Sequence, residues 1–458
     1  MRVVVCVRQG LDGELCPFDA SAYEAALRIE EAEVILLSMG ALSAKDFLHG
    51  LTRLGAKRAI LLSDKAFAGA DTLATAYTLS LAVKLLSPDI VLCGRQTSVG
   101  DTAQTGAMLS ELCGYSLVTN AMSIQISTED RYALCDTRGE GSVKVPLPSI
   151  LTVERINILR LPRLRSKLGD IEVWSAETIG ADTKKCGLAG SPTRVVRTFE
   201  NSAGRRKCKF ISMSELDEAV ADGLKKKKEA IAPKETNGER LNCVCIVGES
   251  PRAFAETVCD NIIVLPLAEV DLLCDAILKV APDAVIWGSD TSSKRLSALV
   301  AARLSLGLCA DCTLLECEEG ELMMYRPALS GSVIAKIKSL TRPAMATVRT
   351  ESGSMSDIII AAGYGAKDSM DKVEALANRY GAELCSTRKM VDNGYTPYSS
   401  QVGLTGKTVS PAVYIAIGVS GAVHHIVGMQ RSGTVIAISP DKDAPIFDHA
   451  DIGILEKF

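Results

Sequence analysis

The sequence predicts an α/β protein made of two pseudo-symmetric, parallel-sheet, nucleotide-binding-like domains and a third α/β domain. Two observations carry this prediction. Short apolar runs alternate with helical stretches and lack polar alternation, which is typical of strands buried on both faces of a parallel sheet. The chain also contains an internal repeat, in which motifs of the first part recur in the same order in the second part. PDIVLCG (88–94) is matched by PDAVIWG (282–288), and LPSILTVER (147–155) by RPAMATVRT (342–350).

The first domain opens with strands and helices in alternation. Strands joined by helices in this order predict a sheet that is covered on both faces. The strands are expected at 3–7, 34–38, 59–63 and 89–94, and the helices near 19–31, 43–54 and 71–86.

The repeat and the changes of composition divide the chain into parts. In the connecting region we expect Ser214 to begin a helix, with Asp217 at the capping-box position, and a polar linker at 233–240. The expected parts are domains at 1–185 and 241–350, a C-terminal arm and linker at 186–240, and a third α/β domain without a counterpart in the first half at 351–458.

The composition excludes several classes of protein. The 458 residues carry 51 basic and 55 acidic side chains, which argues against a general nucleic-acid binder. No apolar stretch reaches the roughly 18 residues that a membrane-spanning helix needs, and the opening apolar run is too short for a signal peptide. We therefore expect a cytoplasmic protein whose fifteen cysteines are free thiols.

A loop of small and hydroxylated residues follows one predicted strand and leads into a helix. It reads GRQTSVGDTAQTGAML (94–109). Its backbone N–H groups and the positive helix end can bind a phosphate, here near Thr105 and Gly106. An ordinary capped helix explains this segment alone equally well.

The last domain holds a sharper candidate, VYIAIGVSGAVHH (413–425). A buried strand ends at Gly418, and Ser420 and Gly421 are expected to begin a helix, a geometry that admits a pyrophosphate. A hydrolase elbow is disfavoured because Ala422 stands where that motif requires glycine. Two histidines follow at 424 and 425. Neighbours on a helix point in different directions, so both are not expected to bind one metal.

Three further segments complete the candidates. QVGLTGK (401–407) offers the Thr405 hydroxyl and CSTRKMVD (385–392) the Arg388 cation, which suit an anionic ligand with polar edges, such as a flavin nucleotide. CADC (309–312) gives a C-x2-C spacing. Ferredoxin-like clusters need four thiolates at tighter, repeated spacing, so we expect no metal site there.

Taken together, these segments resemble the electron-transfer flavoproteins, two-subunit carriers of FAD. The resemblance covers nearly the whole chain and implies a β-subunit-like half fused to an α-subunit-like half. The β-like motifs are CPFD (16–19), FAGADTLATA (67–76), GDTAQTG (100–106) and GSPTRV (190–195), and the α-like motifs are STRKMVDNG (386–394), QVGLTGK, GVSGAVHHIVGM (418–429) and SPDKDAPIF (439–447).

The resemblance implies that FAD binds in the 351–458 domain. Arg388 would lie near N5 of the flavin, Thr405 at the N5 end, and His425 would donate near O2, which together favour the reduced ring. The expected contacts are Thr387, Arg388, Gln401, Val402, Gly403, Leu404, Thr405, Gly418, Ser420, Gly421, Ala422, Val423, His424, His425 and Ser439. Three positions depart from the family's pattern at the adenine end: Tyr364, Leu404 and Ser439.

The resemblance also implies a second ligand and a partner. A flavoprotein dehydrogenase, such as an acyl-CoA dehydrogenase, is expected to dock on 160–169, with Leu164 as an apolar anchor inside a basic rim. Alternatively, these leucines pack on the chain's own core. The first domain is expected to hold AMP or a second FAD against Cys6, Cys16, Asp19, Met39, Gln96, Asp101, Thr102, Gln104, Thr105 and Gly106.

Three functions compete at this point. The first is a single-chain electron shuttle to or from a dehydrogenase. The second is an electron-bifurcating relative that holds a second FAD in its first domain and oxidises NADH. The third is a colourless adenine-nucleotide sensor. The number of bound flavins per chain distinguishes them, since it is one, two or none.

Overall fold

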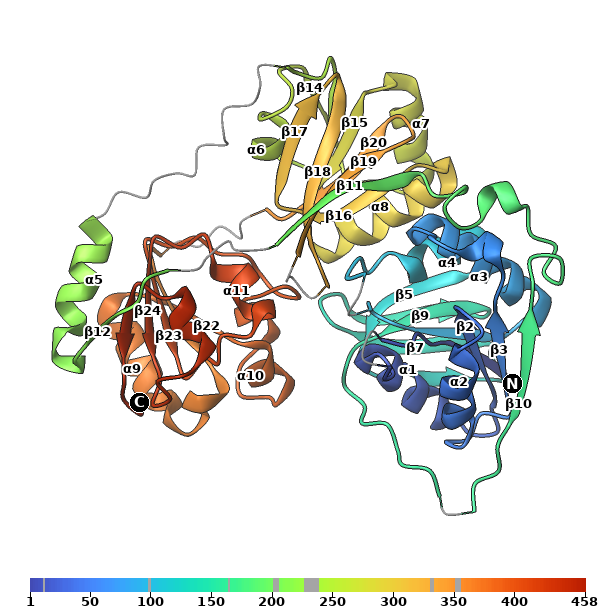
Figure 1. Cartoon of the computed structure of the whole chain (residues 1–458), viewed down its shortest axis with the longest axis horizontal. Helices are drawn as coiled ribbons and strands as arrows, with labels where there is room; N and C mark the ends of the chain where they lie inside the picture. The colour runs from blue at the N-terminus through green and yellow to red at the C-terminus, as the bar shows by residue number, and fades with distance from the viewer. Residues whose placement is uncertain are drawn as a thin grey trace. The chain divides into compact units, whose positions relative to one another are not determined.

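The computed structural model describes residues 1–10, 13–97, 100–163, 165–200, 206–225, 239–329, 333–350 and 356–458. They form several largely parallel sheets with helices between the strands, which confirms the predicted α/β fold class (Figure 1). The chain divides into two compact units. Unit 1 comprises Met1–Thr198, Thr236–Leu329 and Ala335–Val348, and unit 2 comprises Phe199–Glu235, Ser330–Ile334 and Arg349–Phe458.

The largest sheet of unit 1 has ten strands, in the order β10-β3-β2-β1-β4-β9-β5-β7-β6, with β8 paired to β7. Its centre is parallel, and the β6–β8 end is antiparallel. The strands are β1 (Arg2–Cys6), β2 (Glu33–Met39), β3 (Arg58–Leu62), β4 (Ile90–Gly94), β5 (Ser116–Ala121), β6 (Gln125–Ser127), β7 (Tyr132–Thr137), β8 (Gly141–Pro146), β9 (Ser149–Val153) and β10 (Asp170–Trp174).

Helices cover both faces of this sheet. Successive strand residues point to opposite faces, and the residues on each face are apolar. On one face Val3 and Leu36 pack with Tyr23 of α1 (Pro17–Leu27) and Leu48 of α2 (Ala44–Thr52). On the other face α3 (Thr72–Leu86) and α4 (Thr105–Cys113) complete the core. The helix predicted near 19–31 ends earlier, at Leu27, where the Arg28 and Ile29 N–H groups turn to the carbonyls three residues back, those of Ala25 and Ala26.

The second half contributes a smaller parallel sheet to unit 1, in the order β14-β13-β15-β20-β16. Its helix α8 (Thr291–Leu304) packs on α4, where Met108 and Ala301 share one apolar cluster. Arg303 of α8 also pairs with Glu111 of α4 at 2.6 Å. The remaining elements are β13 (Val244–Val247), β14 (Ile262–Leu265), β15 (Ala284–Trp287), β16 (Leu308–Cys312), β20 (Ala344–Val348), α6 (Arg252–Ala255) and α7 (Val270–Val280).

A further sheet of four strands, in the order β11-β19-β18-β17, joins strands from the two halves of the chain. Strand β11 comes from the first half, and β17 to β19 come from the second. The bounds are β11 (Thr193–Glu200), β17 (Leu314–Glu318), β18 (Glu321–Ala328) and β19 (Val333–Ser339).

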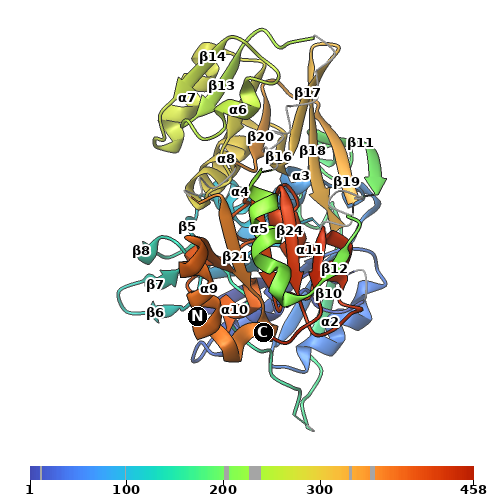
Figure 2. The same cartoon turned by 90° about the vertical axis from the view of Figure 1, so that its left-hand side faces the viewer.

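Unit 2 is built on a parallel sheet in the order β12-β25-β24-β23-β21-β22 (Figure 2). Its central strands are mostly apolar, and every residue of β21, β23 and β24 is buried. The elements are β21 (Ile358–Ala362), β22 (Glu383–Ser386), β23 (Val413–Ile417), β24 (Thr434–Ile438), β25 (Ile452–Ile454), α9 (Met370–Tyr380), α10 (Arg388–Asp392) and α11 (Val423–Met429).

The connecting region is shared: residues 186–198 belong to unit 1, and its described residues 206–225 belong to unit 2. Strand β12 (Lys209–Ile211) pairs with β25. Helix α5 (Leu216–Lys225) lies beside this sheet and buries Leu216 and Val220 in its core (Figure 2). The expected start at Ser214 was wrong. The capping box is formed by Ser212 and Glu215, and a 3-10 turn at Met213–Glu215 precedes α5, because Glu215 reaches back to the Ser212 N–H at 2.9 Å.

Candidate functional site

The residues predicted to bind FAD gather along one edge of the unit 2 sheet. If β21 to β25 are numbered 1 to 5 in chain order, they are arranged 2-1-3-4-5, with β12 added beside β25. The connections therefore reverse direction between β21 and β23, where ligands of such folds bind beyond the carboxyl ends. Thr387 directly follows β22, Gly418 follows β23 and Ser439 follows β24. The 401–407 loop joins the same edge, because the Val402 N–H donates to the Ser386 carbonyl at 2.9 Å.

Two glycines let the chain segments touch at this reversal point. A Cβ on Gly363 would lie 2.1 Å from the Gly418 carbonyl oxygen. Gly418 itself has φ +62°, and its Cβ would lie 2.6 Å from the Ala366 nitrogen. Beyond this contact Ser420, Ala422, Val423 and His424 are exposed. The helix begins later than expected, at Val423, so residues 418–422 form an open backbone loop that suits a pyrophosphate.

The 401–408 loop is held from several directions. Leu404 N–H donates to the His424 carbonyl at 2.6 Å, and the buried Arg349 guanidinium donates to the Leu404 carbonyl at 2.5 Å. The Gln401 amide donates to the Thr405 hydroxyl at 2.8 Å. The Gln401 Oε1 is buried and meets no donor in the described part of the chain, so it remains as an acceptor for a ligand N–H. These groups fit a ring with donor and acceptor edges.

Arg388 brings the positive charge to this edge. It opens α10 directly after Thr387 and pairs with Asp392 one turn later at 3.0 Å. Both side chains are about a quarter exposed (26% each), so the guanidinium lies at the surface of the edge and can face an anionic ligand.

His425 is buried, whereas its neighbour His424 is exposed. Its Nδ1 lies 3.1 Å from the Val402 carbonyl and its Nε2 lies 2.9 Å from the Tyr414 hydroxyl. Burial lowers the pKa of His425 to about 4, and the bond to Val402 opposes this only partly. The neutral ring therefore connects the 401–408 loop to β23.

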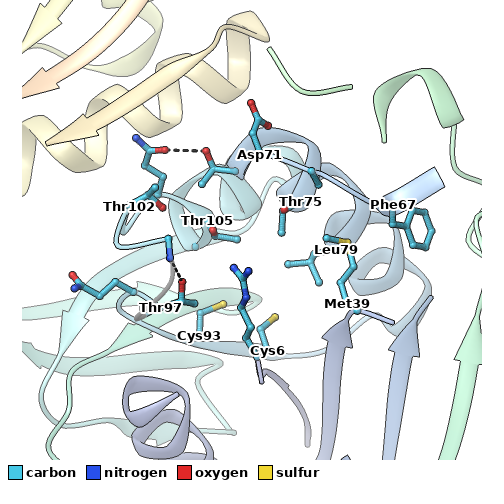
Figure 3. Close-up of a pocket in the computed structure, with 18 of the residues that line it drawn as sticks. Cys6, Met39, Phe67, Asp71, Thr75, Leu79, Cys93, Thr97, Thr102 and Thr105 are labelled. Atoms are coloured by element: carbon cyan, nitrogen blue, oxygen red, sulfur yellow. Dashed lines mark hydrogen bonds between the residues drawn. The ribbon is translucent and has the colours of Figure 1, made fainter. Parts of the chain in front are cut away.

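Unit 1 holds a cavity of about 1040 Å³ at the carboxyl ends of β1 to β4 (Figure 3). The strands there are ordered 3-2-1-4, so the cavity also lies at a reversal point. The predicted residues that line it are Cys6, Asp19, Met39, Gln96, Thr102, Gln104, Thr105 and Gly106. Cys16 and Asp101 stand behind them: the Cys16 thiol donates to the Gln96 carbonyl at 3.5 Å, and Asp101 accepts from the Gln96 amide at 3.1 Å.

The cavity offers donors and cations at its phosphate-loop side. The Gln104 side chain accepts from the Thr72 hydroxyl at 2.9 Å, and its buried Nε2 meets no acceptor among the residues that the structure describes. Asp101 and Ala103 both have positive φ, which turns the loop's backbone into a concave, anion-binding shape. Arg8, Arg95 and Arg326 also line the cavity. This chemistry fits a nucleotide.

Asp19 is a buried carboxyl group in the same wall. Its Oδ2 accepts from the Arg8 N–H at 2.9 Å. Burial raises its pKa to about 7, although hydrogen bonds from the Arg8 and Gly94 backbone N–H groups oppose the shift. Its charge therefore changes near neutral pH.

Sequence reasoning missed residues that reach the two sites from far along the chain. Arg349 and Tyr414 support the FAD edge from 55 and 11 residues away. The cavity wall includes Leu308, Cys309, Arg326 and Ile337 from the second half. No local spacing indicates such contacts. Asp71 and Thr72 lie within the FAGADTLATA motif and could have been named from it.

The segment expected to dock a partner is irregular in its described residues. Leu161 is 86% exposed and Leu168 is 54% exposed, so they do not pack on the chain's own core. Arg160 is fixed by Glu24 at 2.9 Å. Leu164, the expected anchor, lies outside the described residues. In the described ranges no His, Cys, Asp and Glu side chains gather as a metal site, and no helix there is long and apolar enough to cross a membrane.

Comparisons with known proteins agree with these features. A model of the electron transfer flavoprotein domain matches residues 3–179 and 262–375, and a model of the electron transfer flavoprotein FAD-binding domain matches 354–430. Protein FixA of Azorhizobium caulinodans is 39% identical over 236 residues, covering 48% of this chain and 83% of that protein. The caffeyl-CoA reductase-Etf complex subunit CarD of Acetobacterium woodii is 37% identical over 238 residues, covering 48% and 89%.

A relative of the other subunit type also matches. The electron transfer flavoprotein subunit alpha of Thermoanaerobacterium thermosaccharolyticum is 35% identical over 220 residues, covering 38% of this chain and 67% of that protein. The fold and the edge of unit 2 thus define an α/β flavin-binding protein. The chain belongs to the electron transfer flavoprotein family, with a β-like and an α-like half in one polypeptide.

Proposed function

We propose that the chain carries electrons between a flavoprotein dehydrogenase and an acceptor through one FAD bound at the unit 2 edge. The observation that carries the proposal is the gathering of Thr387, Gly418, Ser439 and the 401–408 loop at the reversal point of one parallel sheet. Bound FAD supplies reversible uptake of electrons, and the protein supplies position and electrostatics.

Four groups of this chain have distinct parts in that proposal. The open loop 418–422 receives the pyrophosphate. Arg388 places a cation near the redox edge and so favours the reduced ring. Thr405, which Gln401 orients at 2.8 Å, presents its hydroxyl to the ring. His425 reaches the ring only if it gives up one of its two internal hydrogen bonds.

The partner is proposed to be a dehydrogenase of the acyl-CoA dehydrogenase type. The exposed Leu161 and Leu168 flank the expected anchor Leu164 within a basic segment, and apolar anchors inside a charged rim are typical of transient docking sites. The family implies a redox partner, and the docking segment supports this class of protein.

A second function is favoured by the size of the unit 1 cavity. Its volume of about 1040 Å³ lies just above the range of about 300–1,000 Å³ for ligand pockets, which leaves room for a ligand larger than AMP. A second FAD there would suit an electron-bifurcating protein that oxidises NADH. One relative is named as a subunit of a caffeyl-CoA reductase-Etf complex, which makes a reductase a candidate partner of such a protein.

Flavin content tests both proposals together. The purified chain should bind one FAD if it is a shuttle and two if it bifurcates, and only the second form should be reduced by NADH. Gln104→Glu should remove a ligand from the cavity and leave the unit 2 flavin in place, since it adds negative charge beside the phosphate loop. Gln125→Glu, on an exposed edge strand, is the matched control. A chain without flavin after FAD addition would contradict both proposals.

A further inference from the structure

Strand β16 contains a bulge that places two cysteines on one face. Cys309 lies opposite Ala346 and Cys312 opposite Val348, so three steps along β16 match two steps along β20. In a regular strand, residues three apart point to opposite faces of the sheet. The extra residue of a bulge shifts this alternation by one, so that the two side chains point to the same face. Cys309 and Cys312 accordingly belong to the same core cluster.

The first half repeats this bulge without sulfur. In β5, Val118 lies opposite Leu151 and Ala121 opposite Val153. Asn120 of this bulge has φ +59°, and its backbone N–H donates to the Thr152 hydroxyl at 2.9 Å. Asp311 likewise has φ +56°, and its backbone N–H donates to the Thr347 hydroxyl at 2.8 Å. The bulge therefore forms with valine and alanine, and cysteine at both places is not needed for it.

The two thiols differ in their surroundings. Cys309 lines the unit 1 cavity, and Cys312 is fully buried behind it. A hydrogen bond from the Cys312 thiol, together with the Arg326 charge, lowers the pKa of Cys309 despite its burial. Burial raises the pKa of Cys312, and the bond to Cys309 adds to this. Cys309 is thus the better nucleophile, and Cys312 is placed to react with it.

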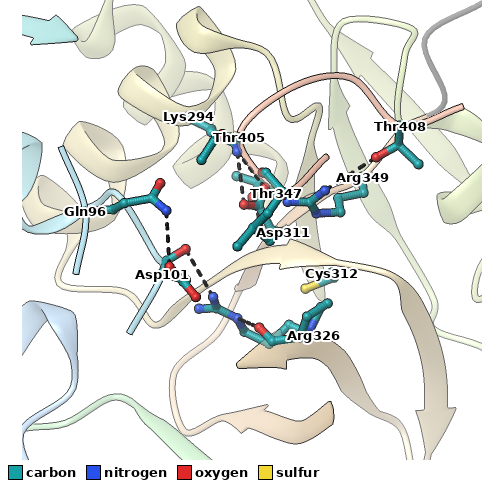
Figure 4. A network of polar contacts seen from close by, with 12 residues as sticks. Gln96, Asp101, Lys294, Asp311, Cys312, Arg326, Thr347, Arg349, Thr405 and Thr408 are labelled. Atoms are coloured by element: carbon teal, nitrogen blue, oxygen red, sulfur yellow. Dashed lines mark hydrogen bonds and ion pairs between the residues drawn. The ribbon is translucent and has the colours of Figure 1, made fainter. Parts of the chain in front are cut away.

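Arg326 connects this pair to the phosphate loop of the cavity. Its guanidinium donates to the carbonyls of Gly100 and Asp101 at 3.0 and 3.2 Å (Figure 4). Next to Cys312 in the chain, Asp311 is held by Lys294 at 2.7 Å. Lys294 thus holds the middle of the bulge, and the Cys312 sulfur lies 3.7 Å from the backbone carbonyl oxygen of Cys309.

We propose that Cys309 and Cys312 form a redox-active dithiol, which closes to an intrachain disulfide when a small hydroperoxide enters through the cavity. The Cys309 thiolate attacks one peroxide oxygen, the O–O bond breaks, and the departing hydroxide takes a proton to form water. The Cys312 thiol then displaces hydroxide from the Cys309 sulfenic acid and supplies the proton that makes the second water. Two thiols lose two electrons, and hydrogen peroxide gains them.

The test uses the full flavin-loaded chain and hydrogen peroxide. After brief exposure, free thiols are alkylated and the chain is cut with trypsin. Trypsin does not cut the Arg326–Pro327 bond, so the peptide runs from Leu304 to Lys336 and contains Cys309, Cys312 and also Cys317. The mass of this peptide should show the loss of two hydrogens, because Cys309 and Cys312 are joined by a disulfide, and one alkyl group, on Cys317. Cys6 and Cys93, which face each other on β1 and β4 and also line the cavity, should react about tenfold more slowly because the pKa of Cys6 is raised.

Two variants introduce the residues that the first half has at the equivalent bulge positions, so the bulge should be kept. They separate the formation of the sulfenic acid from the closure of the disulfide. Cys312→Ala introduces the alanine that the first half has at the equivalent position, Ala121. Its Cys309 sulfenic acid should persist and be trapped by dimedone. Cys309→Val introduces the valine that the first half has at the equivalent position, Val118. It should abolish both the disulfide and the dimedone label. The proposal is overturned if the wild-type peptide keeps three alkylated cysteines while Cys6 and Cys93 become oxidised, or if Cys312→Ala yields no dimedone adduct at Cys309.

Discussion

The Nε2 atom of His425 lies 2.9 Å from the hydroxyl oxygen of Tyr414, on the strand that leads to the His425 helix. Its Nδ1 faces the Val402 carbonyl, which can only accept a hydrogen bond, so Nδ1 carries the proton. Nε2 then accepts from the tyrosine. This neutral tautomer agrees with the lowering of the His425 pKa by burial to about 4.

The first prediction concerns acid stability. Because the folded-state pKa of His425 lies below the unfolded value of about 6.5, its neutral form stabilises the fold fully above that value. This stability should be lost as the pH falls from about 6.5 to 4, at a cost on the order of 3 kcal/mol. Urea unfolding of wild type and His425→Asn at several pH values measures it. The variant should have the shallower pH dependence, and the exposed His424→Asn should keep the wild-type slope.

The second prediction separates the two histidines by their effect on the flavin. His425→Asn should shift the flavin reduction potential, since it changes either a ring contact or the support of the 401–408 loop. Tyr414→Phe frees His425 Nε2 and should shift the potential as well, while His424→Asn should change it less. Spectroelectrochemical titration measures all three. A large shift for His424→Asn with none for His425→Asn would reverse the assignment.

The third prediction concerns Arg388. Arg388→Ala removes the cation at the redox edge and should lower FAD affinity about tenfold or more, or make the flavin harder to reduce. Arg388→Lys should retain part of the effect, because it keeps the charge but not the planar donor geometry. Equilibrium dialysis and redox titration report the two quantities. Unchanged affinity and potential in Arg388→Ala would place the arginine outside the site.

The fourth prediction concerns docking. Leu164→Ala should keep the flavin spectrum and the unfolding midpoint but lose electron transfer to an acyl-CoA dehydrogenase, because an anchor contributes at binding and not to the fold. Leu85→Ala, at another exposed leucine (57%), is the control and should transfer electrons at the wild-type rate. Stopped-flow reduction over a range of dehydrogenase concentrations, up to saturation, decides the matter. Equal rates for both variants and wild type would exclude Leu164 as the anchor.

The fifth prediction concerns the cavity carboxyl. Asp19 is neutral below its raised pKa of about 7 and charged above it, so it should repel a phosphate-bearing ligand as the pH rises. AMP affinity should fall about tenfold between pH 6.5 and 8.5 in wild type. Asp19→Asn should bind with little pH dependence over the same range. Calorimetric titration measures both, and an identical pH dependence in the two proteins would disprove the role of Asp19.

The sequence was informative where neighbours along the chain carry the chemistry. The apolar strands, the reversal-point loops after Gly94 and Gly418, and the repeat could all be inferred from local pattern, and the structure places strands and loops there. The sequence did not predict hydrogen bonds between residues far apart in the chain. Examples are those from Arg349 to the Leu404 carbonyl and from Arg326 to the Gly100 carbonyl. The two ring partners of His425 were equally hidden, because they depend on how helix α11 settles against β23.

The pairing of β12 with β25 has a consequence for assembly. Phe210, from the first half, stands opposite Gly453 near the end of the chain, and a Cβ on that glycine would lie 2.7 Å from the Phe210 ring. In a two-subunit carrier such a strand would have to find its sheet by collision. Here each translation event supplies both partners in a one-to-one ratio, so completion of this sheet should not depend on dilution or on unequal expression of two genes.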